Sequence, residues 1–232
     1  MPVVGFLCSA SASGDAHRIA SVQQGLKEAG YVDGRNLKIE YRWAEHRYDR
    51  LTTLAAELAA FPVAVIVGIG TTPAVVAAKR VTSVIPIVFV IGGDPVELGL
   101  VASLNRPGGN LTGVSFLNRA IVAKQFEILN MAVPNRAVTG YLVNPGNPFA
   151  DADISDAERA ANSLQRQILL AKASTSDEID AAFAKWVKEG IGSALVAGDL
   201  FLNAQMEQIV RLASRYSIPT LYLGAKPPFW AG

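Results

Sequence analysis

Cysteine and histidine are scarce in this chain of 232 residues, which contains one cysteine, Cys8, and two histidines, His17 and His46. A single cysteine excludes an intramolecular disulfide and a cysteine-rich metal site, and in an apolar segment it usually packs as a small hydrophobic residue. The two histidines fall on different expected elements without metal-ligand spacing, and both are expected at solvated surface positions. The sequence therefore predicts no metal ion and no other cofactor.

The chain also lacks a charge excess of either sign and any long apolar segment. Its 21 basic and 20 acidic residues leave a net charge of +1, which gives no electrostatic basis for binding nucleic acid or an anionic membrane. The apolar runs at 63–69 and 85–91 are far shorter than the roughly 20 residues of a membrane-spanning helix. The first residues show no basic region followed by a long apolar one, so no signal peptide is expected. We expect a protein that is not membrane-embedded and does not bind nucleic acid.

Motifs of catalysis and of nucleotide binding are missing too. The sequence has no phosphate-binding loop ending in Gly-Lys-Ser or Gly-Lys-Thr, and no Gly-x-Ser-x-Gly nucleophile motif. The glycine-rich segment that begins at Gly68 is no dinucleotide fingerprint, because Pro73 stands where the third glycine is needed. An enzyme is therefore not expected.

What the sequence does have is a regular alternation of short β-branched runs with helix-length amphipathic segments, which is typical of βαβ units around a parallel sheet. Strands are predicted at residues 3–8, 37–43, 63–67, 87–91, 113–116, 138–143, 168–170, 194–196 and 220–223. Helices are predicted at residues 15–29, 49–60, 73–79, 95–104, 120–131, 156–165, 176–189 and 203–216. The runs 64–67 and 86–90 are apolar throughout, which predicts central strands covered by helices on both faces.

A turn-rich segment of proline, glycine and asparagine at 106–110 interrupts this alternation near the middle of the chain. Such a segment is a natural boundary between domains, and each half is long enough to bury a core. We therefore expect an α/β protein of two Rossmann-like lobes with parallel sheets. The N-terminal lobe is expected at 1–113 and the C-terminal lobe at 114–232.

Polar residues follow the predicted strands of the first half, at the edge where open α/β sheets bind ligands. Ser9 opens a serine-rich segment that could face a ligand or only form a turn. Thr71 and Thr72 precede a proline, where a helix N-terminus could offer amides to a ligand carboxylate, or Thr72 could simply cap the helix. Asp94 also reads as a helix cap, although the two glycines before it would let another group approach the backbone closely.

The second half repeats this arrangement. Asn144 begins a segment of asparagine, proline and glycine after one predicted strand, and Asp199 follows another. Both could serve only as turn and cap residues. Together with the threonines of the first half, however, they offer what a zwitterionic ligand needs: a carboxylate for its ammonium group and donors for its carboxylate.

These strand-end segments, taken in order, resemble those of a known family, the ABC transporter substrate-binding proteins that include the TrpX-like tryptophan- and tyrosine-binding receptors. The similarity runs from about Val3 to Tyr222. The segments that carry it are residues 5–7, 24–26, 30–31, 34–37, 40–44, 72–74, 85–89, 93–96, 99–104, 106–115, 144–145, 147–148, 199, 208–210 and 218–220.

The resemblance implies a periplasmic-binding-protein type I fold, with two lobes joined by a hinge and a ligand held in the cleft between them. It implies that the ligand is an amino acid, sometimes an aromatic one, that the partner is an ABC transporter permease, and that the location is periplasmic or lipid-anchored and extracytoplasmic. Carried over position by position, it implies the following ligand-binding residues: Ser9, Thr71, Thr72, Asp94, Thr112, Ser115, Asn144 and Asp199.

After Tyr222 the apolar segment 223–232 matches nothing in this family, in which the chain continues and crosses back to the first lobe. We therefore expect a C-terminal lobe that is incomplete, with an exposed apolar surface near Phe229 and Trp230. Two other classes share parts of the fold pattern. One is the ligand-sensing effector domain of a transcriptional regulator, and the other is a Rossmann-type enzyme that uses a nucleotide or a sugar phosphate.

Overall fold

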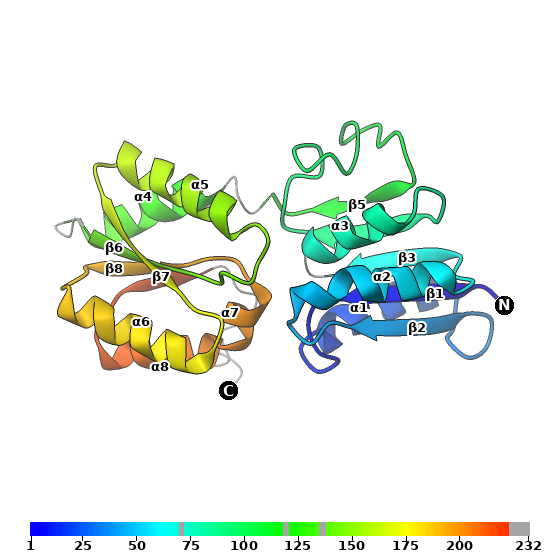
Figure 1. Cartoon of the computed structure of the whole chain (residues 1–232), viewed down its shortest axis with the longest axis horizontal. Coiled ribbons are helices and arrows are strands. Elements are labelled where there is room, and N and C mark those ends of the chain that lie inside the picture. The colour runs from blue at the N-terminus through cyan, green and yellow to red at the C-terminus, as the bar shows by residue number, and fades with distance from the viewer. Residues whose placement is uncertain (70–71, 118–120, 135–137, 223–232) are drawn as a thin grey trace. The chain divides into compact units, whose positions relative to one another are not determined.

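The computed structural model describes residues 1–69, 72–117, 121–134 and 138–222 (Figure 1). The chain divides into two compact units, Met1–Leu117 and Asn118–Gly232. Each unit contains one parallel sheet with helices packed against it, so the predicted α/β class with two parallel sheets is confirmed.

The first unit contains a five-stranded sheet in the order β2-β1-β3-β4-β5, and all of its neighbouring strands are parallel. Its elements are β1 (Val3–Cys8), α1 (Ala16–Glu28), β2 (Lys38–Trp43), η1 (Tyr48–Arg50), α2 (Leu51–Ala60), β3 (Val65–Ile69), α3 (Thr72–Val81), β4 (Ile87–Ile91) and β5 (Leu111–Ser115). Helix α1 packs on the face that carries Phe6 and Val67, whereas α2 and α3 pack on the face that carries Ile66. The apolar stripe of each helix decides which of its sides is buried.

Strand β5 lies in the first sheet beside β4, where Val88 pairs with Thr112 and Ile91 pairs with Ser115. The expected boundary between residues 113 and 114 falls inside this strand, whereas the division of the structure follows Leu117. The proline- and glycine-rich segment 106–110 is therefore part of a crossover within the first unit. A turn signal marks where a chain reverses, but it does not tell whether a new domain begins there.

The helix predicted at 95–104 does not form, and this prediction was wrong. The segment makes a single turn that ends at Gly99, whose φ of 62° lies in the left-handed region. The Leu100 amide donates to the Pro95 carbonyl at 2.8 Å, a bond that closes the turn instead of continuing a helix. Leu100 and Val101 are nevertheless buried in the core under α2 and α3. The apolar spacing that predicted a helix here is therefore due to residues of a loop that are buried in the core.

The prediction that the run 86–90 is covered on both faces was also wrong, because burial alternates along β4. Ile87 and Phe89 face the buried core, whereas Val88 is exposed. Val114 and Phe116, in and just after β5, are exposed as well. Strand β3, by contrast, is buried on both faces. One face of the sheet at β4 and β5 is therefore open in the described part of the chain.

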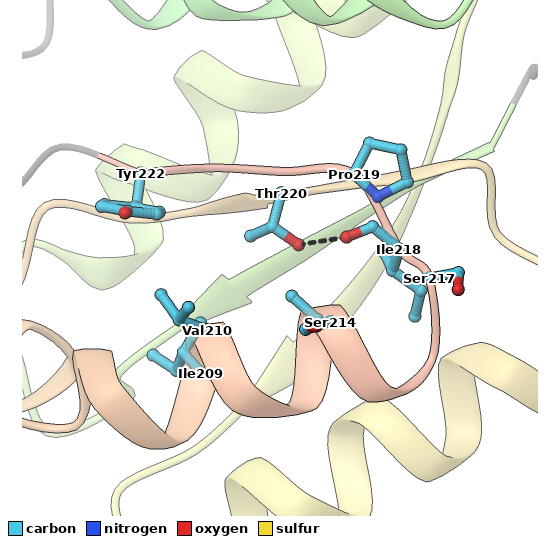
Figure 2. Close-up of a pocket in the computed structure, with 9 residues that line it drawn as sticks. Ile209, Val210, Ser214, Ser217, Ile218, Pro219, Thr220 and Tyr222 are labelled. Carbon is cyan, nitrogen blue, oxygen red and sulfur yellow. Dashed lines mark hydrogen bonds between the residues drawn. The ribbon is translucent and has the colours of Figure 1, made fainter. Parts of the chain in front are cut away.

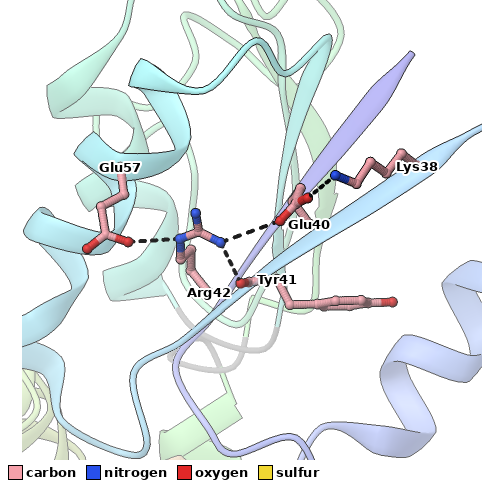
Figure 3. Close-up of polar contacts among 5 residues, drawn as sticks. All are labelled: Lys38, Glu40, Tyr41, Arg42 and Glu57. Carbon is pink, nitrogen blue, oxygen red and sulfur yellow. Dashed lines mark hydrogen bonds and ion pairs between the residues drawn. The ribbon is translucent and has the colours of Figure 1, made fainter. Parts of the chain in front are cut away.

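Strand β2 forms one edge of the first sheet and carries charged side chains along it (Figure 3). Glu40 lies 2.7 Å from the ammonium of Lys38 and 3.8 Å from Arg42, which also donates to Glu57 of α2 at 2.8 Å. Half-exposed ion pairs of this kind contribute little stability. Charges on an edge strand do discourage pairing with another chain, and this is the role that their placement fits.

The second unit contains a four-stranded parallel sheet in the order β7-β6-β8-β9. Its elements are α4 (Val122–Ala132), β6 (Val138–Val143), α5 (Ala150–Ser163), β7 (Gln167–Lys172), α6 (Ser176–Lys188), β8 (Ser193–Val196), α7 (Leu200–Ala204), α8 (Met206–Arg215) and β9 (Thr220–Tyr222). Trp186 of α6 lies fully buried against Gly140 of β6, where a Cβ atom would come within 2.6 Å of the indole ring. Glycine is needed there because only a bare backbone lets the large ring pack against the sheet.

Candidate functional site at the strand ends

The strands of each sheet are parallel, so the segments that follow them meet at one edge of that sheet. In open α/β sheets this carboxyl edge is where ligands bind. In the first unit it is formed by the residues after β1, β2, β3, β4 and β5, and in the second unit by those after β6, β7, β8 and β9.

Ser9 and Asp15 lie between β1 and α1, and both are fully buried. Asp15 occupies the capping position of α1, yet its side chain does not cap the helix. It accepts a hydrogen bond from Arg18 instead, with 2.6 Å between Arg18 Nη1 and Asp15 Oδ1. Its second oxygen, Oδ2, is buried and has no hydrogen-bond partner among the described residues. Burial, and next to it the Asp15 carboxylate, raises the pKa of the Cys8 thiol, which keeps the thiol protonated.

Glu45 and His46 follow β2 and were not predicted as site residues. Their φ angles, 52° and 62°, lie in the left-handed region that non-glycine residues rarely occupy. The His46 amide donates to the Ser9 carbonyl at 2.8 Å, which joins this segment to the end of β1. His46 Nδ1 is buried without a hydrogen-bond partner in the described residues, so the expectation of a solvated surface histidine was wrong for His46. Strained backbone of this kind is concentrated at functional sites.

Thr72, Gly93 and Ser115 lie close together after β3, β4 and β5. A Cβ atom on Gly93 would come 3.0 Å from Thr72 Oγ1, and Ser115 Oγ donates to the Gly93 carbonyl at 2.6 Å. Thr72 is the first residue of α3, one position inside the helix from where it was predicted as the cap. Asp94 Oδ1 accepts from the amides of the two residues that follow Pro95, so Asp94 caps the turn there. Its Oδ2 has no hydrogen bond within the described ranges.

Among the predicted site residues that the structure describes, Thr112 is not brought to this edge. Thr71 lies outside the described residues. Thr112 pairs with Val88 near the beginning of β5, three positions before Ser115, and its side chain is exposed. At about 3.3 Å per strand residue, Thr112 lies roughly 10 Å from the carboxyl edge. Its likeness in sequence to a family position does not place it with the others.

In the second unit Asn144 and Asp199 are brought together as predicted, after β6 and β8. Both are buried, and Asn144 Nδ2 donates to Asp199 Oδ1 at 3.1 Å. Asn147 Nδ2 donates to Asp199 Oδ2 at 3.2 Å. Asp199 Oδ1 also accepts from the amides of Phe201 and Leu202, so Asp199 caps α7. At least four donors therefore surround this carboxylate.

A separate cavity of about 450 Å³ lies between α8 and β9. It is lined by Ile209, Val210, Ala213, Ser214, Ser217, Ile218, Pro219, Thr220 and Tyr222. Figure 2 shows Thr220 directed toward the Ile218 carbonyl, to which its hydroxyl donates at 2.9 Å. The lining has no charged side chain, so this cavity offers no partner for the charged groups of an amino acid.

The described residues show neither a metal site nor a membrane-spanning helix. No group of three or more histidine, cysteine, aspartate and glutamate side chains is placed to hold a metal ion. None of the helices in the described ranges combines the length and the apolar character that crossing a membrane requires. Residues 223–232, where an exposed apolar surface was expected, are not among those that the structure describes.

Two parallel sheets with polar segments at their carboxyl edges define the periplasmic-binding-protein type I fold, and solved proteins of this fold match the chain. Within that class the chain belongs to the family of ABC transporter substrate binding proteins, whose family model matches residues 8–225. The family expected from the strand-end segments is thereby confirmed.

The chain is 28% identical over 196 residues to a tyrosine-binding protein of Clostridioides difficile. That match covers 84% of this chain but 56% of the relative, so the chain spans just over half of the relative's length. A solved conserved domain protein from Vibrio cholerae gives a TM-score of 0.81 at 25% identity, covering 95% of this chain and 73% of that one. A domain from Streptococcus pneumonia in complex with L-Trp gives 0.79 at 23% identity, with the same coverage.

Proposed function

We propose that this chain is the solute-binding component of an ABC transporter and that it binds an amino acid, with an aromatic one favoured. Membership of the substrate-binding family supports the transport role. The tyrosine-binding relative and the neighbour in complex with L-Trp support the ligand class. The role involves binding and release only, with no catalytic step.

The observation that carries this proposal is the burial of polar side chains at both carboxyl edges. Ser9 and Asp15 lie at one edge, and Asn144 and Asp199 at the other, and all four are buried. Burying such groups costs stability unless they are hydrogen-bonded or serve a ligand, and Asp15 Oδ2 has no hydrogen-bond partner among the described residues. An amino acid has a carboxylate and an ammonium group, and once desolvated it needs both donors and acceptors of this kind.

The two predicted partners for the ligand's ammonium group differ in what they still offer. Asp199 has four donors around it, and an ammonium group would have to displace them. Asp94 uses only Oδ1 in its turn and keeps Oδ2 in a half-exposed position. We therefore favour Asp94 over Asp199 as the ammonium partner, and Asp199 as support for the second edge.

The remaining parts of the proposal follow from the family. The partner is an ABC transporter permease, the location is extracytoplasmic, in the periplasm or at a lipid anchor, and nucleic acid is not a ligand. The near balance of basic and acidic residues supports the last point.

A thermal-shift screen tests the function. L-tyrosine, L-tryptophan and L-leucine are added to the chain, with ATP and UDP-glucose as probes of a nucleotide-using enzyme. A ligand that binds only the folded state stabilises it by about 2.7 kcal/mol at 100 times its Kd, so a binding amino acid raises the melting temperature in a concentration-dependent way. Stabilisation by a nucleotide alone, or by none of the compounds, contradicts the proposal.

A further inference from the structure

Arg18 lies at a position of α1 where a positively charged side chain destabilises the helix. It lies in the first turn of α1, which contains no acidic residue. The amino end of a helix carries partial positive charge, so a cation there is unfavourable. Asp15 occupies the capping position yet leaves the helix amides uncapped and pairs with Arg18. The pair is therefore not arranged for the benefit of the helix.

The geometry of the pair directs Arg18 toward the carboxyl edge of the first sheet. Helical side chains lean toward the N-terminus, and α1 begins at the end of the segment that follows β1. Arg18 reaches back past the start of α1 to Asp15, which is fully buried, while 30% of the Arg18 side chain remains exposed. Within the described residues, Arg18 Nη1 to Asp15 Oδ1 is the only hydrogen bond of the guanidinium group.

We propose that Arg18 binds the carboxylate of the amino acid ligand and that Asp15 is a positioning residue, an inference that rests on the proposed function. A guanidinium group presents parallel N–H donors that match a carboxylate in two hydrogen bonds, and one bond to Asp15 leaves donors available. Asp15 fixes the direction of the Arg18 side chain. It also neutralises the charge of Arg18 while no ligand is bound.

The loss of stability at Asp15 indicates that the Asp15–Arg18 pair has a functional role. Its Oδ2 atom is buried and has no partner among the described residues, which destabilises the fold. The ion pair with Arg18, whose side chain is 30% exposed, bonds only the other oxygen of Asp15 and does not satisfy Oδ2. The neighbouring segment also holds strained backbone at Glu45 and His46. An unpartnered buried oxygen and strained backbone therefore occur together at this edge of the sheet. Such unfavourable features are concentrated at ligand-binding sites, and a purely structural salt bridge would not require them.

This assignment differs from the expectation that the ligand carboxylate meets the amino end of α3 at Thr71 and Thr72. Both helices begin at the same edge of the sheet, because β1 and β3 are neighbours. The α3 site would bind the carboxylate through neutral donors, whereas Arg18 would bind it through the N–H groups of a charged guanidinium, part of whose charge Asp15 offsets. Variants of Arg18 and Thr72 therefore separate the two sites.

The test compares L-tyrosine with tyramine, which has the same ring and ammonium group but no carboxylate. Affinities are measured by calorimetry, with competition for the weaker ligand, on the full chain and on R18A, R18K, D15N, T72V and R80A. Arg80 is exposed in the last turn of α3, so R80A removes the same charge far from the edge. L-tryptophan and tryptamine are used in the same way if the first screen shows tryptophan to bind more tightly.

We expect R18A to weaken L-tyrosine binding by about 10- to 100-fold, the range of a charge-assisted hydrogen bond. Tyramine affinity should not change, because tyramine makes no contact with Arg18. R18K should lose less L-tyrosine affinity than R18A. D15N should also lose less L-tyrosine affinity than R18A and should keep its tyramine affinity. R80A should bind both ligands as the unaltered chain does. The ratio of the affinities for L-tyrosine and tyramine should therefore change in R18A. A merely structural role of Arg18 would leave this ratio unchanged.

Two results overturn the inference and leave the proposed function standing. One is unchanged L-tyrosine affinity in R18A while T72V weakens it, which returns the carboxylate to α3. The other is an equal loss for L-tyrosine and tyramine in R18A, which makes Arg18 structural. If the unaltered chain binds neither amino acid, the proposed function itself fails and this inference fails with it.

Discussion

Asp15 in the first unit and Asp199 in the second are both buried carboxylates at the carboxyl edge of a parallel sheet, but their surroundings differ. Asp199 caps α7 and accepts from Asn144 and Asn147, so both of its oxygens are bonded. Asp15 leaves its helix uncapped, pairs with Arg18 and keeps one oxygen without a partner in the described residues. Within the described residues, both oxygens of the buried aspartate are hydrogen-bonded in the second unit, whereas only one is in the first.

We interpret this difference as one between a structural carboxylate and the ligand site proposed above. A buried polar group with all its bonds made rigidifies the fold, whereas one with bonds unmade lowers stability and remains able to interact. Asp199 fits the first description and Asp15 the second. Four changes can break or sharpen the comparison, and they are given from the largest expected effect to the smallest.

Asp199→Ala should lower the free energy of unfolding of the second unit by about 3 kcal/mol, because a helix cap is lost and the amides of the buried Asn144 and the half-buried Asn147 lose their acceptor. Hydrogen exchange measures each unit separately, and the loss should appear in β6 and β8 but not in β1 and β3. Asp199→Asn is the control and should lose less, since asparagine also caps helices well. If Asp199→Ala is as stable as the unaltered chain, Asp199 has no structural role.

His46→Gly should be about 1 kcal/mol more stable than His46→Ala, because glycine adopts the φ of 62° without the strain that a Cβ atom causes. The alanine variant removes the ring but keeps the strain, so the pair isolates the backbone. Cys8 provides the measurement, since its buried thiol with a raised pKa reacts with thiol reagents only when the first unit opens. Labelling should be about fivefold slower in the glycine variant. Equal rates would mean that this backbone stores no strain.

Asp15→Asn should change the free energy of unfolding by less than about 1 kcal/mol, because its partner Arg18 is partly exposed and solvent weakens the ion pair. Exchange of the β1 and β3 amides is the measurement, and Asp199→Asn is the matched change in the other unit. A loss of several kcal/mol would show that Asp15 is as structural as Asp199, and the contrast between the two edges would disappear.

Glu178 gives the smallest effect and extends the comparison to an exposed capping carboxylate. Hydrogen bonds from Ser174 and Thr175 lower the pKa of Glu178, which forms a capping box with Thr175 at the start of α6. Because the folded-state pKa is lowered, its stabilisation is present above the ordinary glutamate pKa and is lost as the pH falls through the lowered value.

The free energy of unfolding of the unaltered chain and of Glu178→Gln should therefore differ most at neutral pH. The difference should shrink as the pH falls through the acidic range, as denaturant titrations at a series of pH values can show. A difference that does not depend on pH would mean that the charge of Glu178 contributes nothing to the cap.

Most strands were predictable because their local pattern and their burial agree. The β-branched runs at β1, β4 and β6 were placed to the residue, since apolar side chains on successive positions leave few alternatives to a buried strand. The helix predicted at 95–104 failed because a loop can bury the same apolar spacing once a residue such as Gly99 takes a left-handed φ.

The position of a polar side chain was predictable where the residue directly follows a strand, although its role in binding stays a prediction. Ser9, Asp94, Asn144 and Asp199 were found in this way, and Asn144 and Asp199 do bond to each other. Asp15, Arg18 and His46 were missed because aspartate before a helix reads as a cap, an arginine in a helix reads as surface, and a lone histidine reads as solvated.

The sequence by itself determined the α/β class and the parallel strands, because periodicity is a local property. The family followed from the resemblance of its segments to a known family and is confirmed by the match over residues 8–225. The binding edge stays a prediction. Tertiary structure decided that β5 completes the first sheet and that Thr112 lies away from the edge. It also decided that the Asp199 oxygens are fully bonded while one Asp15 oxygen has no partner in the described residues. Whether a buried polar atom is bonded depends on residues distant in the chain, and only folding brings those residues within hydrogen-bonding distance.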